Sequence, residues 1–521
     1  MIKKTKARCI LFFTLLLGLP FCGISQKAKT NAGLLSYTIP VLKRAKNNPI
    51  QRIRIYTERG QTSTRQLFIT TDPASAAGIM QIDIFATGAE PKFSDAKRAA
   101  TINTIQTKNT IPLNIALQPG INYLWVSILL NDNAPTGKKI NLQTRALSLS
   151  DGSTLALQPI KNPQKGWYTG TAIRQPGDDG VHTYRIPGIT ATDKNTLIAV
   201  YDIRYKNSSD LPSDIDVGMS RSTDNGKTWE PMKVIMTMGK PGDNSGIGDP
   251  SILFDPVTKK IWVAALWSKG NHSIAGSGPG ISPEVSGQFV LASSDDDGKT
   301  WSAPINITSQ VKNPIWHLYF QGPGNGIAMK NGTLVFPSQY WDEGKKPGIP
   351  HSSIIYSTDH GNTWKSGTGA KSNTTEAQVV ETTPGTLMLN MRDNRGSFRS
   401  IATTRNFGGS WLEHPSSYKA LPDPVCMASL IKARVNISGR PKEVLFFSNM
   451  NSSDARNHLT IKASLDLGET WLPAHQLLLD ERKAYGYSSL VKVDDRTIGI
   501  LYEGTGALNF VAVPVNDIIR P

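Results

Sequence analysis

The sequence predicts an all-β protein in which an N-terminal β-sandwich precedes a six-bladed β-propeller. Three observations lead to this fold class. An octet exemplified by "STDNGKTW" (222–229) recurs in the second part of the chain, short stretches of alternating or apolar residues fill the first part, and helix signals are sparse throughout. We expect three segments in order: a signal peptide at 1–26, the sandwich at 27–158 and the propeller at 159–521.

The first 26 residues have the features of a secretory signal peptide. Four cations near the start precede the apolar run "CILFFTLLLGLPF", and small residues follow it. This run is too short to span a bilayer comfortably and no later stretch is apolar enough, so we expect no integral membrane span. The chain is therefore predicted to be secreted or periplasmic, with a lipid anchor at Cys22 and a cell-surface location as the alternative.

Composition narrows the partners that the mature chain can bind. Without the four signal cations the net charge falls from +16 to +12, and such an excess attracts anions. Nucleic acid is one candidate, although the basic residues are dispersed and no zinc-finger, RNP or GxxG signature is present; an acidic glycan would be attracted equally well, and charge alone does not choose between them. Only Cys426 remains beyond the signal, so packing rather than an internal disulfide must stabilise the fold, and we expect this thiol to be buried.

Residues 27–158 are predicted to form the β-sandwich. Stretches such as "RIRIYTE" (52–58), "MQIDIFA" (80–86) and "YLWVSILL" (123–130) have strand-like lengths, and turn residues separate them at short intervals. A carbohydrate-binding role and a packing role that supports the second domain are equally open for this segment. Trp125 lies inside an apolar stretch, so we expect it in the core.

The spacing of the octets predicts the propeller in residues 159–521. The octets end at Trp229, Trp301, Trp364, Trp411 and Trp471, which are 72, 63, 47 and 60 residues apart. A period near 60 suits four-stranded blades with long loops. About 360 residues divided by about 60 gives six blades, of which five carry the octet.

Each octet is predicted to fasten a tight turn. Its aspartate can accept hydrogen bonds from backbone N–H groups, its glycine permits positive φ, its threonine can close the loop, and its tryptophan can pack flat between neighbouring sheets. The alternative is an EF-hand-like calcium loop, but in the first copy Arg221 and Met232 stand where oxygen ligands are needed. The octets therefore organise the fold, and the chemistry must lie elsewhere.

Two motifs together resemble the bacterial exo-α-sialidases, or neuraminidases. The octet has the form of the Asp box, S-x-D-x-G-x-T-W, and "TYRIPGIT" (183–190), just before the first copy, is similar to the YRIP motif of that family. The resemblance extends from about residue 165 to residue 521. It implies a six-bladed propeller with the active site at its centre and a terminal sialic acid as the substrate.

The resemblance also implies three arginines that bind the carboxylate on the anomeric carbon of sialic acid. Guanidinium groups suit this task because they offer paired donors at fixed angles. Arg185 of "YRIP" and Arg392 of "LNMRDNRG" match the first two, and Arg456 of "ARNHLTIKASLD" is the best candidate for the third. Lys462 is a poor substitute because a point charge cannot fork. Glu503 of "GILYEG" matches the family's glutamate that supports the first arginine.

The departing oxygen needs a proton from a carboxylic acid. The family acid lies on a loop about 25 residues after the YRIP arginine and shortly after another arginine. Asp210 of "YDIRYKNSSDLPSDID" fits both marks, and Arg204 then resembles the arginine that lines the sugar's 4-hydroxyl and N-acetyl side. Asp214 and Asp216 are expected to belong to the following strand.

The resemblance implies a tyrosine nucleophile, which is the known exception among retaining glycosidases. A neutral phenol is not repelled by the substrate's carboxylate, but it must lose its proton to a neighbouring base. Tyr487 of "AYGYSSLV" is the better match and Tyr485 is the fallback. Glu376 of "TTEAQVVE" is the expected base, 16 residues before the second arginine, and Glu381 is the weaker choice.

Asp249 of "GIGDPSIL" and Gln339 of "FPSQYW" complete the candidates, as contacts to polar substituents of the sugar. We predict a monomeric exo-α-sialidase that releases terminal sialic acid from glycoproteins, glycolipids or oligosaccharides with retention, without a metal or other cofactor. Three alternatives stay open: a sialic-acid-binding lectin without turnover, a trans-sialidase of the ordinary or intramolecular kind, and a non-enzymatic propeller scaffold.

Overall fold

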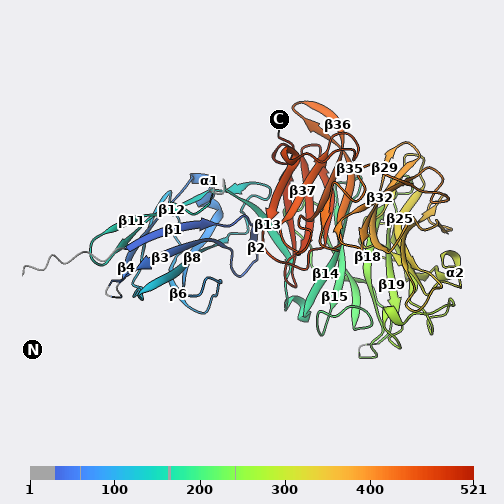
Figure 1. Ribbon diagram of the computed structural model, residues 1–521, viewed down its shortest axis with the longest axis horizontal. Coiled ribbons are helices and arrows are strands. Elements are labelled where there is room, and N and C mark those ends of the chain that lie inside the picture. The colour runs from blue at the N-terminus through green and yellow to red at the C-terminus, as the bar shows by residue number, and fades with distance from the viewer. Residues whose placement is uncertain (1–29, 59, 61, 162–165, 241, 521) are drawn as a thin grey trace, which may run out of the picture.

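The computed structural model describes residues 30–58, 60, 62–161, 166–240 and 242–520. The predicted signal peptide at 1–26 lies outside these residues. The described chain is all-β, with only short helices, as the sequence predicted. Figure 1 shows the blue and cyan N-terminal domain at one end and the longer succession of sheets, from green to red, at the other.

The N-terminal domain consists of two antiparallel sheets that enclose one apolar core, apart from the parallel pair β1–β12. Alternation along β3 and β8 places Ile53, Ile55, Leu124 and Val126 inside. Trp125 is buried as expected, at 5% exposed, but it lies on the opposite face of the sheet, where it stacks on Tyr37. The first sheet has the order β12 (Gln158–Pro159), β1 (Thr30–Ser36), β3 (Pro49–Thr57), β8 (Gly120–Leu130), β5 (Ile79–Gly88) and β6 (Arg98–Ile102). The second has the order β11 (Thr154–Ala156), β10 (Leu142–Leu149), β4 (Thr64–Thr71) and β7 (Lys108–Pro112), and α1 is Pro73–Gly78.

In the described part of the C-terminal domain, the strands form six sheets of four or more strands. The first two are β14 (Thr183–Ala191), β15 (Leu197–Arg204), β16 (Ile215–Ser222), β17 (Lys233–Met236), and then β18 (Gly246–Phe254), β19 (Ile261–Ser268), β20 (Gln288–Ser294), β21 (Ile305–Asn306) with β23 (Gly324–Asn325) beside β18. The third has β22 (Leu318–Gln321), β24 (Ile327–Ala328), β25 (Leu334–Trp341), β26 (Pro350–Ser357), β27 (Lys365–Ser366) and β28 (Lys371–Ser372).

The last three sheets follow in chain order. They are β29 (Thr374–Thr383), β30 (Thr386–Asp393), β32 (Ser400–Thr404), β33 (Leu412–Glu413); then β35 (Ser429–Ile437), β36 (Arg440–Met450), β37 (Leu459–Ser464), β38 (Gln476–Asp480); and finally β39 (Ser488–Asp494), β40 (Thr497–Glu503), β41 (Leu508–Pro514) with β13 (Trp167–Arg174). A two-stranded pair, β31 (Ser397–Phe398) with β34 (Pro422–Asp423), and the short helices α2 (Thr308–Val311) and α3 (Val515–Ile518) complete the domain.

These sheets follow one another around a ring. The inner strands contact each other in the order β14, β18, β22 with β24, β29, β35, β39 and back to β14, and an apolar layer fills the space between each pair of neighbouring sheets. Such a cyclic arrangement of antiparallel sheets is typical of a β-propeller.

The final sheet closes the ring because it combines distant parts of the chain. β13, the first strand of the domain, pairs with β41, which is the last strand. Two short strands from the N-terminal domain, β2 (Val41–Lys43) and β9 (Lys139–Ile140), also pair with β13. The two domains are therefore joined by backbone hydrogen bonds as well as by the connecting segment.

The five octets form the same turn. In the first copy, Asp224 Oδ1 accepts the Thr228 N–H at 3.0 Å, Asp224 Oδ2 accepts the Thr228 hydroxyl at 2.6 Å, and Ser222 Oγ accepts the Gly226 N–H at 2.9 Å. Gly226 has a φ of +80°. The corresponding acceptors in the other copies are Asp296, Asp359, Asn406 and Asp466. The predicted fastening role is consistent with these bonds.

Two of the octet tryptophans, Trp229 and Trp364, pack into the apolar layers between sheets and meet an aromatic neighbour edge to face. The Trp229 ring is tilted 66° from that of Phe510, and the Trp364 ring is tilted 81° from that of Trp262. Edge-to-face contact places the positive ring edge on the negative face of the neighbour, which aromatic pairs prefer.

Replacement of Asp296 tests the role of the octet turn. Burial raises the pKa of Asp296, but hydrogen bonds led by that from Thr300 outweigh it and lower the pKa from 3.8 to about 2. We expect Asp296→Ala to lower the free energy of unfolding by about 1–3 kcal/mol at pH 7, measured by urea denaturation. Asp296→Asn should lose less, because Asn406 makes equivalent bonds in its copy. This stabilisation is present above pH 3.8 and is lost as the pH falls towards 2.

The neighbouring Asp295, whose side chain is 75% exposed, provides the control for this test. Asp295→Ala should change stability by less than about 0.5 kcal/mol. Equal losses in Asp295→Ala and Asp296→Ala would contradict the fastening role.

Candidate active site

A fully buried carboxylate joins two sheets at the centre of the ring. Glu503, at the end of β40, is 0% exposed, and its Oε1 accepts Arg185 Nε at 3.1 Å and the Ile186 N–H at 2.9 Å. Its Oε2 accepts the Tyr487 N–H at 3.0 Å. Ile186 on β14 has a φ of +57°, which a β-branched residue adopts only when its surroundings enforce it. Glu503 therefore positions Arg185, the strained backbone after it, and the chain entering β39.

Tyr487, Glu376 and Arg392 meet within hydrogen-bond distance. The Tyr487 hydroxyl donates to Glu376 Oε1 at 2.5 Å, and Arg392 Nη1 donates to Glu376 Oε2 at 2.6 Å and to Tyr487 Oη at 3.1 Å. Burial raises the pKa of Tyr487 well above its ordinary value, the charge of Glu376 raises it further, and Arg392 partly opposes both. The phenol is therefore neutral, and its proton already points at a carboxylate.

The third candidate arginine lies beside the same tyrosine. Arg456, in the loop between β36 and β37, donates to the backbone carbonyls of Tyr485 at 3.0 Å and Val425 at 3.1 Å. The guanidinium centres of Arg185 and Arg456 lie 5.4 and 5.9 Å from the centroid of the Tyr487 ring. The three arginines predicted from separate motifs thus gather around one side chain.

The candidate acid stands at the exposed edge of this cluster. Asp210 Oδ1 accepts Arg204 Nη1 at 2.7 Å and lies 3.5 Å from Arg185 Nη1, and its side chain is 76% exposed. Arg204 itself is 1% exposed, and its Nε and Nη2 donate to Asp202 Oδ2 at 3.1 and 2.8 Å. The loop between β15 and β16 therefore anchors Asp210 through a buried arginine and leaves its carboxyl open to solvent.

The two softer candidates have different surroundings. Asp249 on β18 donates its backbone N–H to Asp202 Oδ1 at 2.8 Å, and burial, followed by the charge of Asp202, raises the pKa of the Asp249 carboxyl well above its ordinary value. Gln339 on β25 is 2% exposed, and no hydrogen bond or ion pair among the described residues joins it to the other nine candidates. Gln321, on the inner strand β22, instead donates to the Asp249 carbonyl at 2.6 Å.

Tyr485 and Glu381, the alternative candidates for nucleophile and base, make different contacts from Tyr487 and Glu376. The ring of Tyr485 lies over the Arg185 guanidinium at 4.6 Å, so it belongs to the site without meeting Glu376 in any hydrogen bond of the described residues. Glu381, further along β29, accepts the backbone N–H groups of Lys330 and Gly385 at 2.9 and 2.8 Å. Its carboxylate fastens a turn.

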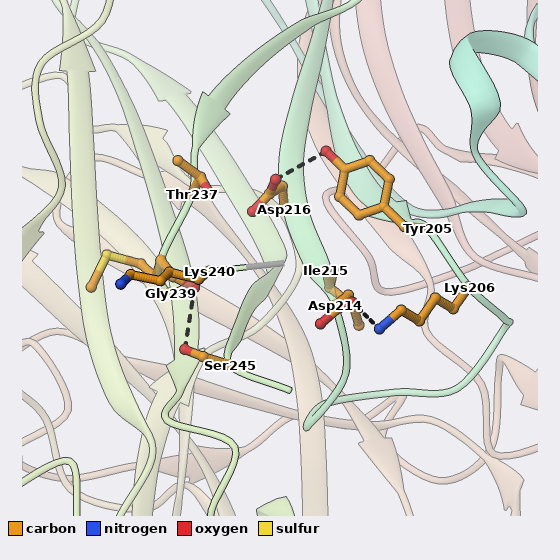
Figure 2. A pocket seen from close by; sticks show the side chains of 10 residues that line it. Tyr205, Lys206, Asp214, Ile215, Asp216, Thr237, Gly239, Lys240 and Ser245 are labelled. Carbon is orange, nitrogen blue, oxygen red and sulfur yellow. Dashed lines mark hydrogen bonds and ion pairs between the residues drawn. The ribbon is translucent and has the colours of Figure 1, made fainter. Parts of the chain in front are cut away.

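Asp214 and Asp216 line a separate hollow of about 340 Å³. Figure 2 shows Asp216 bonded to Tyr205 and Asp214 paired with Lys206, with Ser245 on the other side. Asp216 lies on β16, and Asp214 directly precedes this strand. None of the ten candidate residues lines this hollow.

Sequence reasoning gave Asp202 no role, although it connects two candidates. It is 1% exposed and holds both the Arg204 side chain and the Asp249 backbone. Asp202 and Arg204 are two residues apart on β15, so they share a face. The sequence did contain a signal for this pair that was not used, namely a carboxylate and a cation two residues apart in an otherwise apolar strand.

Two remaining features bear on cofactors and reactivity. Cys426 is 0% exposed, as expected, and burial raises the pKa of its thiol to about 12. Among the residues that the structure describes, no group of three or more His, Cys, Asp or Glu side chains could hold a metal ion. Within the same residues, no helix is both long and apolar enough to cross a membrane.

Comparison with known proteins identifies the family. Residues 195–502 match the family described as a BNR repeat-like domain, and residues 29–153 match the N-terminal domain of BNR-repeat neuraminidase. A sialidase of Bacteroides fragilis is 42% identical over 518 aligned residues, which cover 92% of this chain and 94% of that protein. The chain belongs to the BNR-repeat neuraminidase, or sialidase, family. The predicted membership is confirmed.

A further sialidase and two solved structures are also similar to this chain. A sialidase of Micromonospora viridifaciens is 32% identical over 68% of this chain and 55% of its own length. The structure of the Hadza microbial sialidase Hz136 has a TM-score of 0.86 at 39% identity and covers 93% of this chain and 100% of that one. An intramolecular trans-sialidase from Ruminococcus gnavus, at 18% identity and a TM-score of 0.57 over 67% of this chain and 98% of its own, shares the fold alone.

Glu503→Gln tests whether the buried carboxylate holds the site together. An amide leaves the buried Arg185 with only the exposed Asp210, at 3.5 Å, as a counter-charge, and its NH2 group cannot accept an N–H. We expect a loss of about 3–5 kcal/mol in the free energy of unfolding, measured by denaturant titration. Glu284→Gln is the control, since that side chain is 60% exposed and pairs with a surface lysine. Similar free energies of unfolding for the two variants would show that the Glu503 carboxylate does not hold the site together.

Proposed function

We propose that this protein is an exo-α-sialidase that releases terminal sialic acid from glycoproteins, glycolipids or oligosaccharides and retains the anomeric configuration. The observation that carries the proposal is the contact among Tyr487, Glu376 and Arg392, with the phenol 2.5 Å from a carboxylate oxygen. A buried tyrosine with a base at its hydroxyl is what covalent catalysis by this side chain requires.

The three arginines bind the carboxylate of the sugar. Arg185, Arg392 and Arg456 come from three different sheets and surround the Tyr487 ring. Their guanidinium groups offer several donors to one anionic group, and this fixes the anomeric carbon above the phenol. The uncharged state of Tyr487 favours this binding, because a phenolate would repel the carboxylate.

The first chemical step forms a bond between Tyr487 Oη and the anomeric carbon. The phenol proton passes to Glu376, to which it is already hydrogen-bonded. The bond between the anomeric carbon and the leaving oxygen breaks, and this oxygen takes the proton of Asp210, the exposed carboxyl of the site.

The second step hydrolyses the tyrosyl intermediate. Asp210, now a carboxylate, takes a proton from water as the water oxygen attacks the anomeric carbon. The bond to Tyr487 breaks, and its oxygen recovers the proton from Glu376. Two inversions at one carbon give net retention. Arg204 and Asp249 line the substituents of the sugar beside Asp210, whereas the position of Gln339 rests on the motif alone.

We extend the proposal to the location and state of the protein. The charged and apolar pattern of residues 1–26 supports export to the periplasm or the medium. A monomer suffices, because all proposed catalytic groups come from one chain. The mature net charge of +12 favours approach to acidic glycans.

Tyr487→Phe tests the nucleophile. Loss of the hydroxyl removes the atom that attacks, whereas the three arginines remain, so we expect turnover of a fluorogenic sialoside to fall by at least about 10³-fold with the affinity for an unhydrolysable sialic-acid analogue nearly retained. Tyr418→Phe is the control, since Tyr418 is 38% exposed. Near-normal turnover of Tyr487→Phe, together with loss in Tyr485→Phe, would assign the nucleophile to Tyr485.

Asp210→Ala tests the acid. Natural glycans leave as poorly acidic alcohols and need the proton, whereas 4-methylumbelliferol leaves without help. The ratio of kcat/KM for the fluorogenic sialoside to that for sialyllactose should therefore rise by about 10²-fold or more. An unchanged ratio would remove Asp210 from this role.

Product analysis of the wild-type enzyme separates the remaining activities. Free sialic acid with retained configuration, followed by NMR at early times, is the expected product in the presence of excess lactose. Sialylated lactose would indicate a trans-sialidase, an anhydro-sugar would indicate the intramolecular kind, and binding without any turnover would indicate a lectin.

A further inference from the structure

Arg456 is held differently from the other two arginines of the site. Arg185 and Arg392 each pair with a buried or largely buried carboxylate. Among the described residues, the hydrogen bonds of the Arg456 guanidinium go to two backbone carbonyls, those of Tyr485 and Val425. Its position therefore depends on where these two carbonyls point.

The backbone at Val425 is strained. Val425 has a φ of +56°, and among the described residues it shares a positive φ with only one other β-branched residue, Ile186. Such a conformation is unfavourable for a β-branched residue and persists only when the surroundings enforce it. Both residues lie at the site: Ile186 packs with Cys426, Met427 and Tyr487 in one apolar cluster. Something must hold the segment 423–427 in this shape.

The buried ion pair of Arg399 and Asp423 binds both backbone groups of Cys426, the residue after Val425. Arg399 Nη1 donates to the Cys426 carbonyl at 2.7 Å, and Asp423 Oδ1 accepts the Cys426 N–H at 2.9 Å. Arg399 Nη1 lies 3.6 Å from Asp423 Oδ2. Arg399 and Asp423 are 0% and 1% exposed, so neither reaches a bound sugar.

The Arg399 guanidinium also binds β30, the strand that carries Arg392. Arg399 Nε donates to Asn390 Oδ1 at 2.8 Å, and its Nη2 donates to the Asn390 carbonyl at 3.2 Å. Asn390 precedes Arg392 by two residues on β30. Arg399 is thus a cross-link between the strand that presents Arg392 and the segment whose carbonyl holds Arg456.

We propose that Arg399 and Asp423 are positioning residues that hold Val425 in its strained conformation and thereby set Arg456 for the carboxylate of the substrate. This inference rests on the proposed function, in which Arg456 binds that carboxylate. The planar shape of the Arg399 guanidinium is essential to this role, because all three of its nitrogens donate hydrogen bonds, in different directions. A lysine keeps the charge but can replace few of these bonds.

Arg399→Lys is the test, and the readout is the preference for a carboxylate. Inhibition constants are measured for 2,3-didehydro-2-deoxy-sialic acid and for its carboxamide, which differ only at the group that the arginines bind. We expect the inhibition constant of the carboxamide divided by that of the acid to fall by about tenfold or more, because one charge-assisted contact to the carboxylate is misplaced. A general loss of stability changes the amount of folded protein but not this ratio.

Arg221→Lys is the matched control. Arg221 is also buried, at 8% exposed, and pairs with Asp297 at 2.8 Å, but it fastens an octet turn instead of the site. Its substitution should lower the melting temperature and leave the ratio at the wild-type value.

The double variant Arg399→Lys with Arg456→Met tests the route of the effect. If Arg399 acts through Arg456, the double variant has the same ratio as Arg456→Met alone, and the two effects are not additive. Additive effects, a wild-type ratio in folded Arg399→Lys, or an equal fall in Arg221→Lys would each overturn the inference.

Asp423→Asn is the alternative test variant if Arg399→Lys does not fold. It keeps an acceptor for the Cys426 N–H but removes the charge opposite Arg399, and the same fall in the ratio is expected. An unchanged ratio here overturns the inference while wild-type turnover leaves the proposed function intact. A wild-type protein that neither cleaves sialosides nor binds the inhibitor would overturn the proposed function itself.

Discussion

The buried carboxylate of Glu503 is the interaction on which the rest of the site depends. A charge without exposed surface is tolerated only when a counter-charge and hydrogen-bond donors surround it. Glu503 obtains these from Arg185 and from the backbone N–H groups of Ile186 and Tyr487. Because these donors belong to β14 and to the chain entering β39, the carboxylate sets the relative position of the first and last sheets of the ring. A guanidinium and a phenol from distant motifs thereby reach the same place.

The same arrangement recurs at two further points around the site. Asp202 accepts the N–H of Asp249, which has a φ of +57°, and pairs with an arginine. Asp423 accepts the N–H that follows Val425 and also lies beside an arginine. In each case a buried carboxylate both neutralises a cation and binds a backbone N–H at or beside a residue with positive φ, which the β-branched Ile186 and Val425 disfavour. Strain of this kind is sustainable because the apolar layers between sheets and the octet turns stabilise the ring independently of the site.

The charges of the site explain why its tyrosine is neutral and its arginines are so firmly held. Several guanidinium groups converge on one region and would repel each other without the carboxylates between them. Burial and the nearby Glu376 both disfavour a phenolate at Tyr487. The site is therefore rich in fixed donors and contains a neutral phenol that is hydrogen-bonded to a carboxylate. This combination suits a substrate that carries its own carboxylate at the reacting carbon.

The sequence by itself determined the features that depend on short-range interactions. Strand alternation and the bonding pattern of the octet are local, so they predicted an all-β chain, two domains and the fastening turns, and the motifs around Arg185, Arg392, Glu376 and Tyr487 predicted the chemical types that the structure brings together. Tertiary structure alone decided that strands of the first domain extend the closing sheet, that carbonyls hold Arg456, and that Asp202 braces the arginine that holds Asp210. These outcomes depend on how whole sheets pack around a ring, and contacts between residues far apart in the chain leave no period or spacing in the sequence.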